Sequence, residues 1–133
     1  PLGQGDLPAA EARDVLGPGR ILGRSTHSPE QAAAAEAEGA DYVGVGPVFE
    51  TGTKQHAAAV GLEYVSHCAA KVDLPGFAIG SVNEETVEKV IAAGARRLAI
   101  CTGITMKPDV TAATRLFRDK LDAARAADAG GKG

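Results

Sequence analysis

Short apolar runs recur along the chain, with polar, helix-forming stretches between them. The runs start near Ile21, Tyr42, Phe77 and Leu98, so successive starts lie about 21, 35 and 21 residues apart. Each interval is long enough for a helix that crosses over between two parallel strands. The pattern predicts about four β/α units with a parallel sheet, and we expect the strands to be buried on both faces.

Glycines and capping residues mark where the predicted helices end and begin. Gly39 and Gly94 each follow an alanine-rich stretch and precede an apolar run, which is typical of a junction between helix and strand. Ser28, followed by proline and then by a glutamine at the capping-box position, predicts one helix start. Asn83 predicts another, with the helix running from Glu84 onward.

The length of the chain limits the architecture. Helices are also expected from about residue 6 to 15 and from about 109 to 127, followed by a flexible polar tail over 128–133. A complete eight-fold barrel needs roughly 200 residues or more, and 133 residues supply about half of one. We therefore expect residues 1–127 to be the carboxyl-terminal half, about the last four β/α units, of a TIM (β/α)8 barrel.

The composition excludes several classes of protein. The chain is 44% hydrophobic and 23% charged, with a formal net charge of −3. No block of like charge favours nucleic acid, and no apolar run approaches the ~20 residues of a membrane span. Cys68 and Cys101 lack metal-ligand spacing and the start of the chain lacks a signal-peptide pattern, so we expect reduced thiols and a cytoplasmic protein.

Small residues and hydroxyls gather where the predicted strands end. They are Ser25-Thr26-His27, Gly46-Pro47, Gly80-Ser81 and Cys101-Thr102-Gly103. Such residues let backbone N–H groups approach a ligand, helix amino termini expected after Gly80 and Gly103 add positive dipole ends, and the last two loops are the usual phosphate site of this architecture. The pattern indicates a phosphorylated small molecule, although each residue alone is equally typical of a turn or cap.

A long connection follows the second predicted strand. Within it, Thr51, Thr53 and Lys54 offer two hydroxyls and an ammonium beside a flexible glycine. This combination suits an active-site flap that clamps a pyrophosphate. A solvated surface loop is the alternative.

Four further polar residues are candidates for a role in the site. The Asp6 carboxylate could hold Mg²⁺ together with substrate oxygens, or could only cap the helix that starts at Leu7, and Gln4 supplies an amide nearby. His27 could contact a ligand, donate to a backbone carbonyl or carry a proton. Arg24 could contact an anion inside the barrel or snorkel to the surface.

Taken together, these motifs resemble thiamine phosphate synthase. They are GQGDLP at 3–8, GRSTH at 23–27, GADYVGVGPVF at 39–49, TGTK at 51–54 and AIG at 78–80. The resemblance runs in order from Pro1 to about the end of the last helix. It implies a (β/α)8-barrel transferase of thiamine biosynthesis, which joins hydroxymethylpyrimidine pyrophosphate to hydroxyethylthiazole phosphate and releases pyrophosphate.

The resemblance also implies residue roles. Ser25 and Lys54 would be catalytic, with Lys54, Thr51 and Thr53 closing over the pyrophosphate, and Asp6 would be a Mg²⁺ ligand. The implied substrate-binding residues are Gln4, Ser25, His27, Thr51, Thr53, Lys54, Gly80, Ser81, Cys101 and Thr102.

The sequence departs from the family pattern in places, and the resemblance has alternatives. The departures are Pro1, Gly5, Glu50 and Ser81. The family's second metal ligand and its pyrimidine-recognition residues belong to earlier strands, so the chain alone is expected to be inactive and to need a missing barrel half or self-association. Thiazole tautomerase, with His27 in proton transfer, is one alternative, and a non-catalytic module for phosphate binding or assembly is another.

Overall fold

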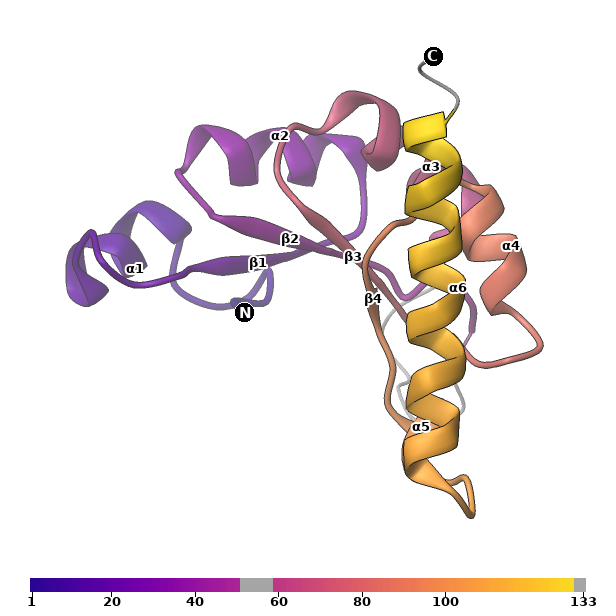
Figure 1. The fold of residues 1–133 in the computed structure, drawn as a ribbon. Coiled ribbons are helices and arrows are strands. Elements are labelled where there is room, and N and C mark those ends of the chain that lie inside the picture. Colours follow the sequence, from indigo (N-terminus) through magenta and orange to yellow (C-terminus); the bar gives the residue numbers. More distant parts are fainter. Residues whose placement is uncertain (51–58, 131–133) are drawn as a thin grey trace.

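A parallel sheet forms the centre of the molecule (Figure 1). The computed structural model describes residues 1–50 and 59–130. Within them the strands are β1 (Gly23–Thr26), β2 (Tyr42–Val45), β3 (Gly76–Ile79) and β4 (Leu98–Ala99). They pair in parallel in the order β1-β2-β3-β4. The predicted succession of four β/α units around a parallel sheet is confirmed.

Helices alternate with these strands along the chain. They are α1 (Ala9–Leu16), α2 (Pro29–Ala37), α3 (Gly61–Lys71), α4 (Val87–Ala92), α5 (Thr102–Thr105) and α6 (Val110–Gly130). In Figure 1, α2 lies over one side of the sheet, and the long α6 stands beside β4 and α4. No helix in the described part of the chain is long and apolar enough to cross a membrane.

Of the two expected caps, Ser28 caps the start of α2, and Asn83 caps a turn that precedes α4. Ser28 Oγ accepts a hydrogen bond from Gln31 N at 3.3 Å, and Gln31 Oε1 accepts one from His27 N at 2.8 Å. Asn83 Oδ1 accepts from the backbone N–H of Glu85 and Thr86, at 2.9 and 3.1 Å. These bonds hold a turn over 84–86, so α4 itself begins later than expected, at Val87.

Asp6 does not cap α1. Its Oδ2 accepts a hydrogen bond from Gly3 N at 2.8 Å, which closes a turn before the helix. The residue preceding α1 is Pro8, which makes no side-chain capping bond. The first helix therefore starts at Ala9 and not at Leu7. The Asp6 carboxylate accepts from the backbone N–H of Gly3, which precedes it in the chain, and from no N–H group of the helix.

The helices cover one face of the sheet, and the expectation that both faces are buried is wrong for the described residues. Val43, Val45 and Ala78 point to the helices and are at most 2% exposed. On the other face Tyr42 and Phe77 meet edge to face, with ring centroids 5.3 Å apart, and are half-buried. Ile79 on this face is 46% exposed. The strands therefore alternate between a packed face and an open one.

Arg24 takes neither of the positions considered for it. Its side chain points to the packed face and is buried, and its Nη1 donates to the carbonyls of Gly3 and Leu7 at 3.0 and 3.3 Å. Leu2 forms a parallel bridge with Arg24, through Leu2 N to Gly23 O and Ser25 N to Leu2 O, both 2.8 Å. Arg24 thus ties the first residues of the chain to the outer edge of β1.

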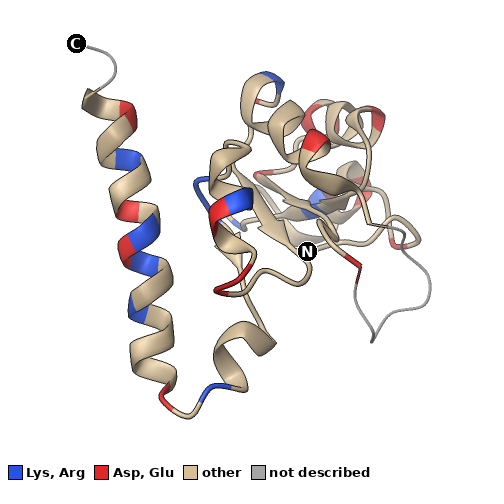
Figure 2. Cartoon of the chain, turned by 90° about the vertical axis from the view of Figure 1, so that its right-hand side faces the viewer, with Lys and Arg blue, Asp and Glu red and all other residues tan. Residues whose placement is uncertain are grey.

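Ion pairs and one buried aromatic ring attach α6. Phe117, 4% exposed, is the fully buried side chain of this helix. Arg96 Nε pairs with Asp128 of α6 at 2.7 Å, and Lys120 of α6 pairs with Glu88 of α4. A further pair, Lys107 with Glu84, holds the segment just before α6. Charged side chains are spread along the helix (Figure 2).

The end of α6 differs from the prediction. A flexible tail was expected from residue 128, but the helix continues through Gly130. Asp128 accepts from Arg96 Nε and Nη2 at 2.7 and 3.0 Å, so its carboxylate holds the last helical turn against the preceding α/β unit. Residues 131–133 of the predicted tail lie outside the described part.

We predict that Phe117→Ala weakens the attachment of α6. Removing a buried aromatic ring costs about 3 kcal/mol or more of unfolding free energy, and hydrogen exchange should increase along α6 before the sheet opens. Val110→Ala, which truncates a 49% exposed side chain on the same helix, is the control and should change stability by less than about 1 kcal/mol. Equal urea midpoints for the two variants would contradict the prediction.

Candidate functional site

The loops that follow β2, β3 and β4 lie in direct contact. Val48 N donates to Ile79 O at 2.8 Å, and Ser81 Oγ donates to Glu50 O at 3.0 Å. A Cβ on Gly103 would lie 2.7 Å from Val82 O, so the loop after β4 packs against the loop after β3. The sequence-predicted residues of these loops therefore form one continuous surface.

Glycine is required where the first two of these loops cross. A Cβ on Gly80 would lie 2.6 Å from Pro47 Cα, and Gly80 has φ +107°. A Cβ on Gly46 would lie 2.2 Å from Ile79 O. Next to this crossing Ser81 has φ 53°, a left-handed conformation that is uncommon for a residue with a side chain. The two loop backbones can approach each other this closely because Gly46 and Gly80 have no side chain.

Backbone donors are unpaired on this surface. The N–H groups of Gly80, Ser81, Cys101 and Thr102 donate no hydrogen bond in the described part of the chain. These residues are partly or wholly exposed, and unpaired N–H groups at the carboxyl ends of parallel strands are suited to binding the oxygens of an anion. The side chain of Cys101 is exposed, so the thiol borders the surface that its own N–H helps to form.

The helix amino termini contribute less than the sequence predicted. α4 begins at Val87, six residues after Ser81, because the turn capped by Asn83 intervenes. α5 does begin at Thr102, but it is a single turn of four residues. The positive character of this surface rests on individual N–H groups rather than on the dipole of a long helix.

Ser25 and Gln4 meet at the end of β1. Gln4 Nε2 donates to Ser25 O at 2.6 Å, so the amide is fixed to the strand backbone. The Ser25 side chain is half-buried on the open face of the sheet, and its hydroxyl makes no hydrogen bond to the residues described. The hydroxyl is free to contact a ligand on that face.

His27 is oriented by the loop after β2. Its Nδ1 lies 2.5 Å from Gly46 O, and because a carbonyl only accepts, Nδ1 carries the proton. The ring is exposed and Nε2 is left as the acceptor. Of the three roles considered for His27, donation to a backbone carbonyl is therefore present in the structure.

A buried hydrogen-bond chain supports this corner of the site, and sequence analysis missed it. Tyr64 OH donates to Thr26 Oγ1 at 2.6 Å, and Thr26 Oγ1 donates to Gly44 O at 2.8 Å. Burial raises the pKa of the Tyr64 phenol, against a smaller opposing effect of its bond to Thr26. The chain links α3 to the ends of β1 and β2. No local pattern indicates a pair 38 residues apart.

The described residues offer limited metal coordination. No group of three potential His, Cys, Asp or Glu ligands occurs within residues 1–50 and 59–130. Asp6 uses Oδ2 on Gly3, and its Oδ1 makes no hydrogen bond to the rest of the described chain. One carboxylate with a free oxygen fits the usual binding of Mg²⁺, which takes one or two carboxylates plus substrate oxygens. Thr51, Thr53 and Lys54 lie outside the described residues.

The family of the chain follows from comparison with known proteins. Residues 2–104 match the family model described as thiamine monophosphate synthase. The chain belongs to this family. A thiamine-phosphate synthase of Gloeobacter violaceus is 50% identical over 121 residues, which are 91% of this chain and 36% of that protein. One from Pelotomaculum thermopropionicum is 45% identical over 118 residues, 88% of this chain and 54% of that protein.

A solved structure supports the same relationship. The thiamine phosphate pyrophosphorylase from Pyrococcus furiosus superposes with a TM-score of 0.83 at 33% identity, over 92% of this chain and 58% of that one. The α/β fold with its parallel sheet is therefore that of the family. The chain spans about a third to a half of the length of the curated relatives described above.

We predict that Tyr64→Phe lowers the free energy of unfolding by about 1 kcal/mol, because it removes a buried hydrogen bond. Since folding raises the pKa of this phenol, the wild-type chain loses stability as the pH rises above the unfolded value of about 10. The Tyr64→Phe variant has no ionisable phenol at this position, so it should not show the loss of stability that Tyr64 causes at high pH. Urea unfolding at pH 7 and near pH 11 measures both effects. Tyr42→Phe is the control, and equal losses in the two variants would contradict the role of the buried chain.

We predict that Gly80→Ala is strongly destabilising, by about 2 kcal/mol or more, because the added Cβ combines positive-φ strain with a clash against Pro47. Gly5→Ala is the control, since a Cβ there meets nothing within 4 Å. Thermal unfolding of the two variants checks the prediction. A Gly80→Ala midpoint equal to that of Gly5→Ala would show that the loops do not need their close approach.

Proposed function

We propose that this chain is the carboxyl-terminal part of a thiamine phosphate synthase. In this proposal hydroxymethylpyrimidine pyrophosphate is joined to hydroxyethylthiazole phosphate, with release of pyrophosphate. The observation that carries the proposal is the set of unpaired N–H groups of Gly80, Ser81, Cys101 and Thr102. They would bind the thiazole phosphate. Family membership supports the same chemistry.

Ser25 and the loop of Thr51, Thr53 and Lys54 would act on the other substrate. The unpaired Ser25 hydroxyl lies on the open sheet face, where it would contact the pyrimidine and its pyrophosphate. Lys54, with the two threonine hydroxyls, would neutralise the leaving pyrophosphate, which carries the charge that develops during bond cleavage. Gln4 would act mainly by fixing the backbone of Ser25.

Asp6 would supply one carboxylate oxygen to Mg²⁺. The bound ion would neutralise pyrophosphate oxygens. The hydrogen bond from Gly3 N fixes one oxygen of the Asp6 carboxylate, and the other oxygen would be the Mg²⁺ ligand. Remaining ligands would come from substrate oxygens, water and parts of a complete barrel.

The open face and the edges of the sheet support the proposal that the sheet is part of a larger closed barrel. Leu2 continues the sheet beyond β1, and β4 at the other edge is only two residues long. Half-buried Tyr42 and Phe77 and exposed Ile79 form an apolar face without helices. We propose that four further β/α units, or a second copy of this half, cover this face, in a cytoplasmic enzyme whose partners are small phosphorylated substrates and neither nucleic acid nor membrane.

Thiazole tautomerase is the second candidate function, and the orientation of the His27 ring supports it. With Nδ1 bound to Gly46 O, Nε2 could exchange a proton with a thiazole ring. A phosphate-binding module without catalysis would use the same unpaired N–H groups. Chelation separates the enzymes, because the synthase needs Mg²⁺ to stabilise pyrophosphate and a tautomerase has no such need.

The test is synthesis of thiamine phosphate by the chain mixed with the segment of the Pelotomaculum thermopropionicum relative that precedes the matched region. We expect activity in the mixture with Mg²⁺ and little with the chain alone. Ser25→Ala should lower kcat/KM by about 10²-fold, in line with loss of a single transition-state donor. Thr111→Ala, on the exposed surface of α6, is the control. A folded, fully active Ser25→Ala complex would contradict the role of Ser25, and a folded but inactive mixture that binds thiazole phosphate would favour the other two functions.

A further inference from the structure

Ser81 has a backbone conformation that a residue with a side chain disfavours. Its φ is 53°, and it is the one non-glycine residue with positive φ in the described part of the chain. In this left-handed region the Cβ of an L residue is crowded against the backbone. Such a conformation persists only where the surrounding structure holds it. The hydrogen bonds of Ser81 show what holds it here.

Two neighbouring segments hold Ser81 from different sides. Its Oγ donates to Glu50 O at 3.0 Å, in the segment that follows β2. Its carbonyl oxygen accepts from Thr86 Oγ1 at 2.9 Å, and this oxygen is nearer to Thr86 Oγ1 than the carbonyl or side-chain oxygen of Asn83. Thr86 Oγ1 in turn accepts from Asn83 N at 2.9 Å. The side chain and the carbonyl of Ser81 are therefore fixed at the same time.

The peptide group that carries the Ser81 N–H is also held in place. Gly80 O accepts from Phe49 N, in a long hydrogen bond of 3.4 Å. The bond between Gly80 and Ser81 is trans, and in a planar trans peptide the N–H points away from the C=O. The Ser81 N–H therefore points away from the segment after β2. It donates to no acceptor among the residues that the structure describes.

We propose that Ser81 and Thr86 are positioning residues of the phosphate site, whose hydroxyls hold the Gly80–Ser81 peptide so that the Ser81 N–H is oriented to donate to a phosphate oxygen. The inference rests on the proposed function for the identity of the phosphorylated ligand. The Ser81 hydroxyl has one proton, which it donates to Glu50, so the side chain acts through the backbone and not on the phosphate itself. A donor that is already oriented loses little conformational freedom when the anion binds.

Replacement by glycine separates positioning from stability at residue 81. Glycine adopts positive φ without strain, so Ser81→Gly removes the hydroxyl and the crowding together. If Ser81 only formed a turn, the glycine variant would equal the wild type in stability and in phosphate binding. If the hydroxyl positions the peptide, the variant keeps its stability but binds phosphate more weakly.

The test is a titration of ¹⁵N-labelled chains with inorganic phosphate and, separately, with hydroxyethylthiazole phosphate. We expect saturable shifts of the wild-type backbone amides of Gly80, Ser81, Cys101 and Thr102. Ser81→Gly and Ser81→Ala should each weaken the binding of both probes about fivefold, as expected for the loss of one hydrogen bond. Thermal unfolding of Ser81→Gly should have about the wild-type midpoint, because relief of the strain offsets the lost bond.

Thr86 tests the other side of the peptide. Thr86→Val removes the hydroxyl and should weaken the binding of inorganic phosphate. Thr86→Ser restores a hydroxyl at the same position and should bind phosphate like the wild type. Equal binding by the valine and serine variants would overturn the role of Thr86.

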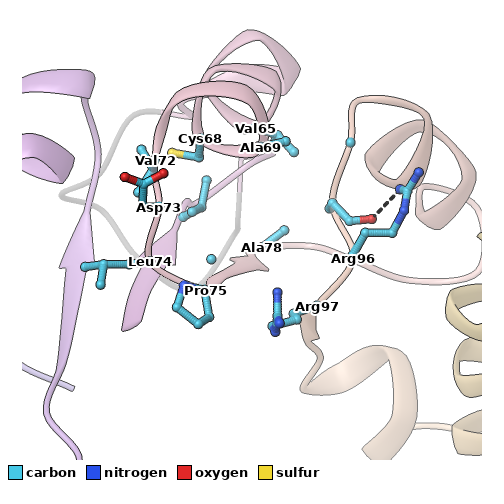
Figure 3. Close-up of a pocket in the computed structure, with 14 residues that line it drawn as sticks. Val65, Cys68, Ala69, Val72, Asp73, Leu74, Pro75, Ala78, Arg96 and Arg97 are labelled. Atoms are coloured by element: carbon cyan, nitrogen blue, oxygen red, sulfur yellow. Dashed lines mark hydrogen bonds between the residues drawn. The ribbon is translucent and has the colours of Figure 1, made fainter. Parts of the chain in front are cut away.

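Ser66→Ala is the matched control for Ser81. Ser66 Oγ, on α3, donates to Ala93 O at 2.8 Å, which is also an exposed bond from a hydroxyl to a carbonyl. Ala93 directly precedes Gly94, which lines a cavity of about 250 Å³ toward the amino-terminal ends of β3 and β4 (Figure 3). This bond lies away from the loops at the carboxyl ends of the strands, so its loss should leave phosphate binding unchanged.

The outcomes distinguish this inference from the proposed function. Wild-type affinity in Ser81→Gly, or an equal loss in Ser66→Ala, would overturn the positioning role while the phosphate site itself stands. Binding of inorganic phosphate without binding of hydroxyethylthiazole phosphate would count against the proposed function, and the series with inorganic phosphate would still decide the role of Ser81. An absence of shifts with both probes up to about 10 mM, where a millimolar site is mostly filled, would overturn both.

Discussion

The parallel register of the strands is the constraint on which the rest of the molecule depends. Ser25 lies beside Gly44 and Val45 beside Ala78, so the chain leaves β1, β2 and β3 at the same edge of the sheet. This edge brings Ser25 and His27 together with Gly80, which lies far from them in sequence. The glycines that let the loops cross are needed because the register brings Pro47 against Gly80.

Much of this arrangement could be predicted from local sequence, because it depends on local chemistry. Apolar runs, the Ser28 cap and the glycines after helices each act within a few residues. The prediction from sequence was wrong where the conformation of a residue depends on a partner that is distant in sequence. Asp128 stays helical because Arg96 binds it, and Arg24 turns inward because Gly3 and Leu7 offer carbonyls. Neither partner can be identified from sequence spacing.

In the candidate site, too, the features set by local sequence were predicted and those set by distant contacts were not. Residue types at the strand ends indicated an anion site, and unpaired N–H groups are present there. The predicted helix-dipole contribution after Gly80 is smaller than expected, because the Asn83 turn delays the start of α4. The Tyr64 and Thr26 pair, which supports the end of β1, could not be found without knowing that α3 packs on that strand. Hydrophobic periodicity indicates which face of a strand is buried, but it does not indicate which helix covers that face.

The attachment of α6 has a consequence for how the molecule responds to its solvent. A 21-residue helix is joined to the body by one fully buried ring and by bridges that include Arg96 to Asp128 and Lys120 to Glu88. Bridges near the surface are screened as the ionic strength rises, whereas a buried sheet core is not. Salt therefore acts unevenly on this fold. It loosens the last helix while it leaves the strand register, and the loops that depend on it, in place.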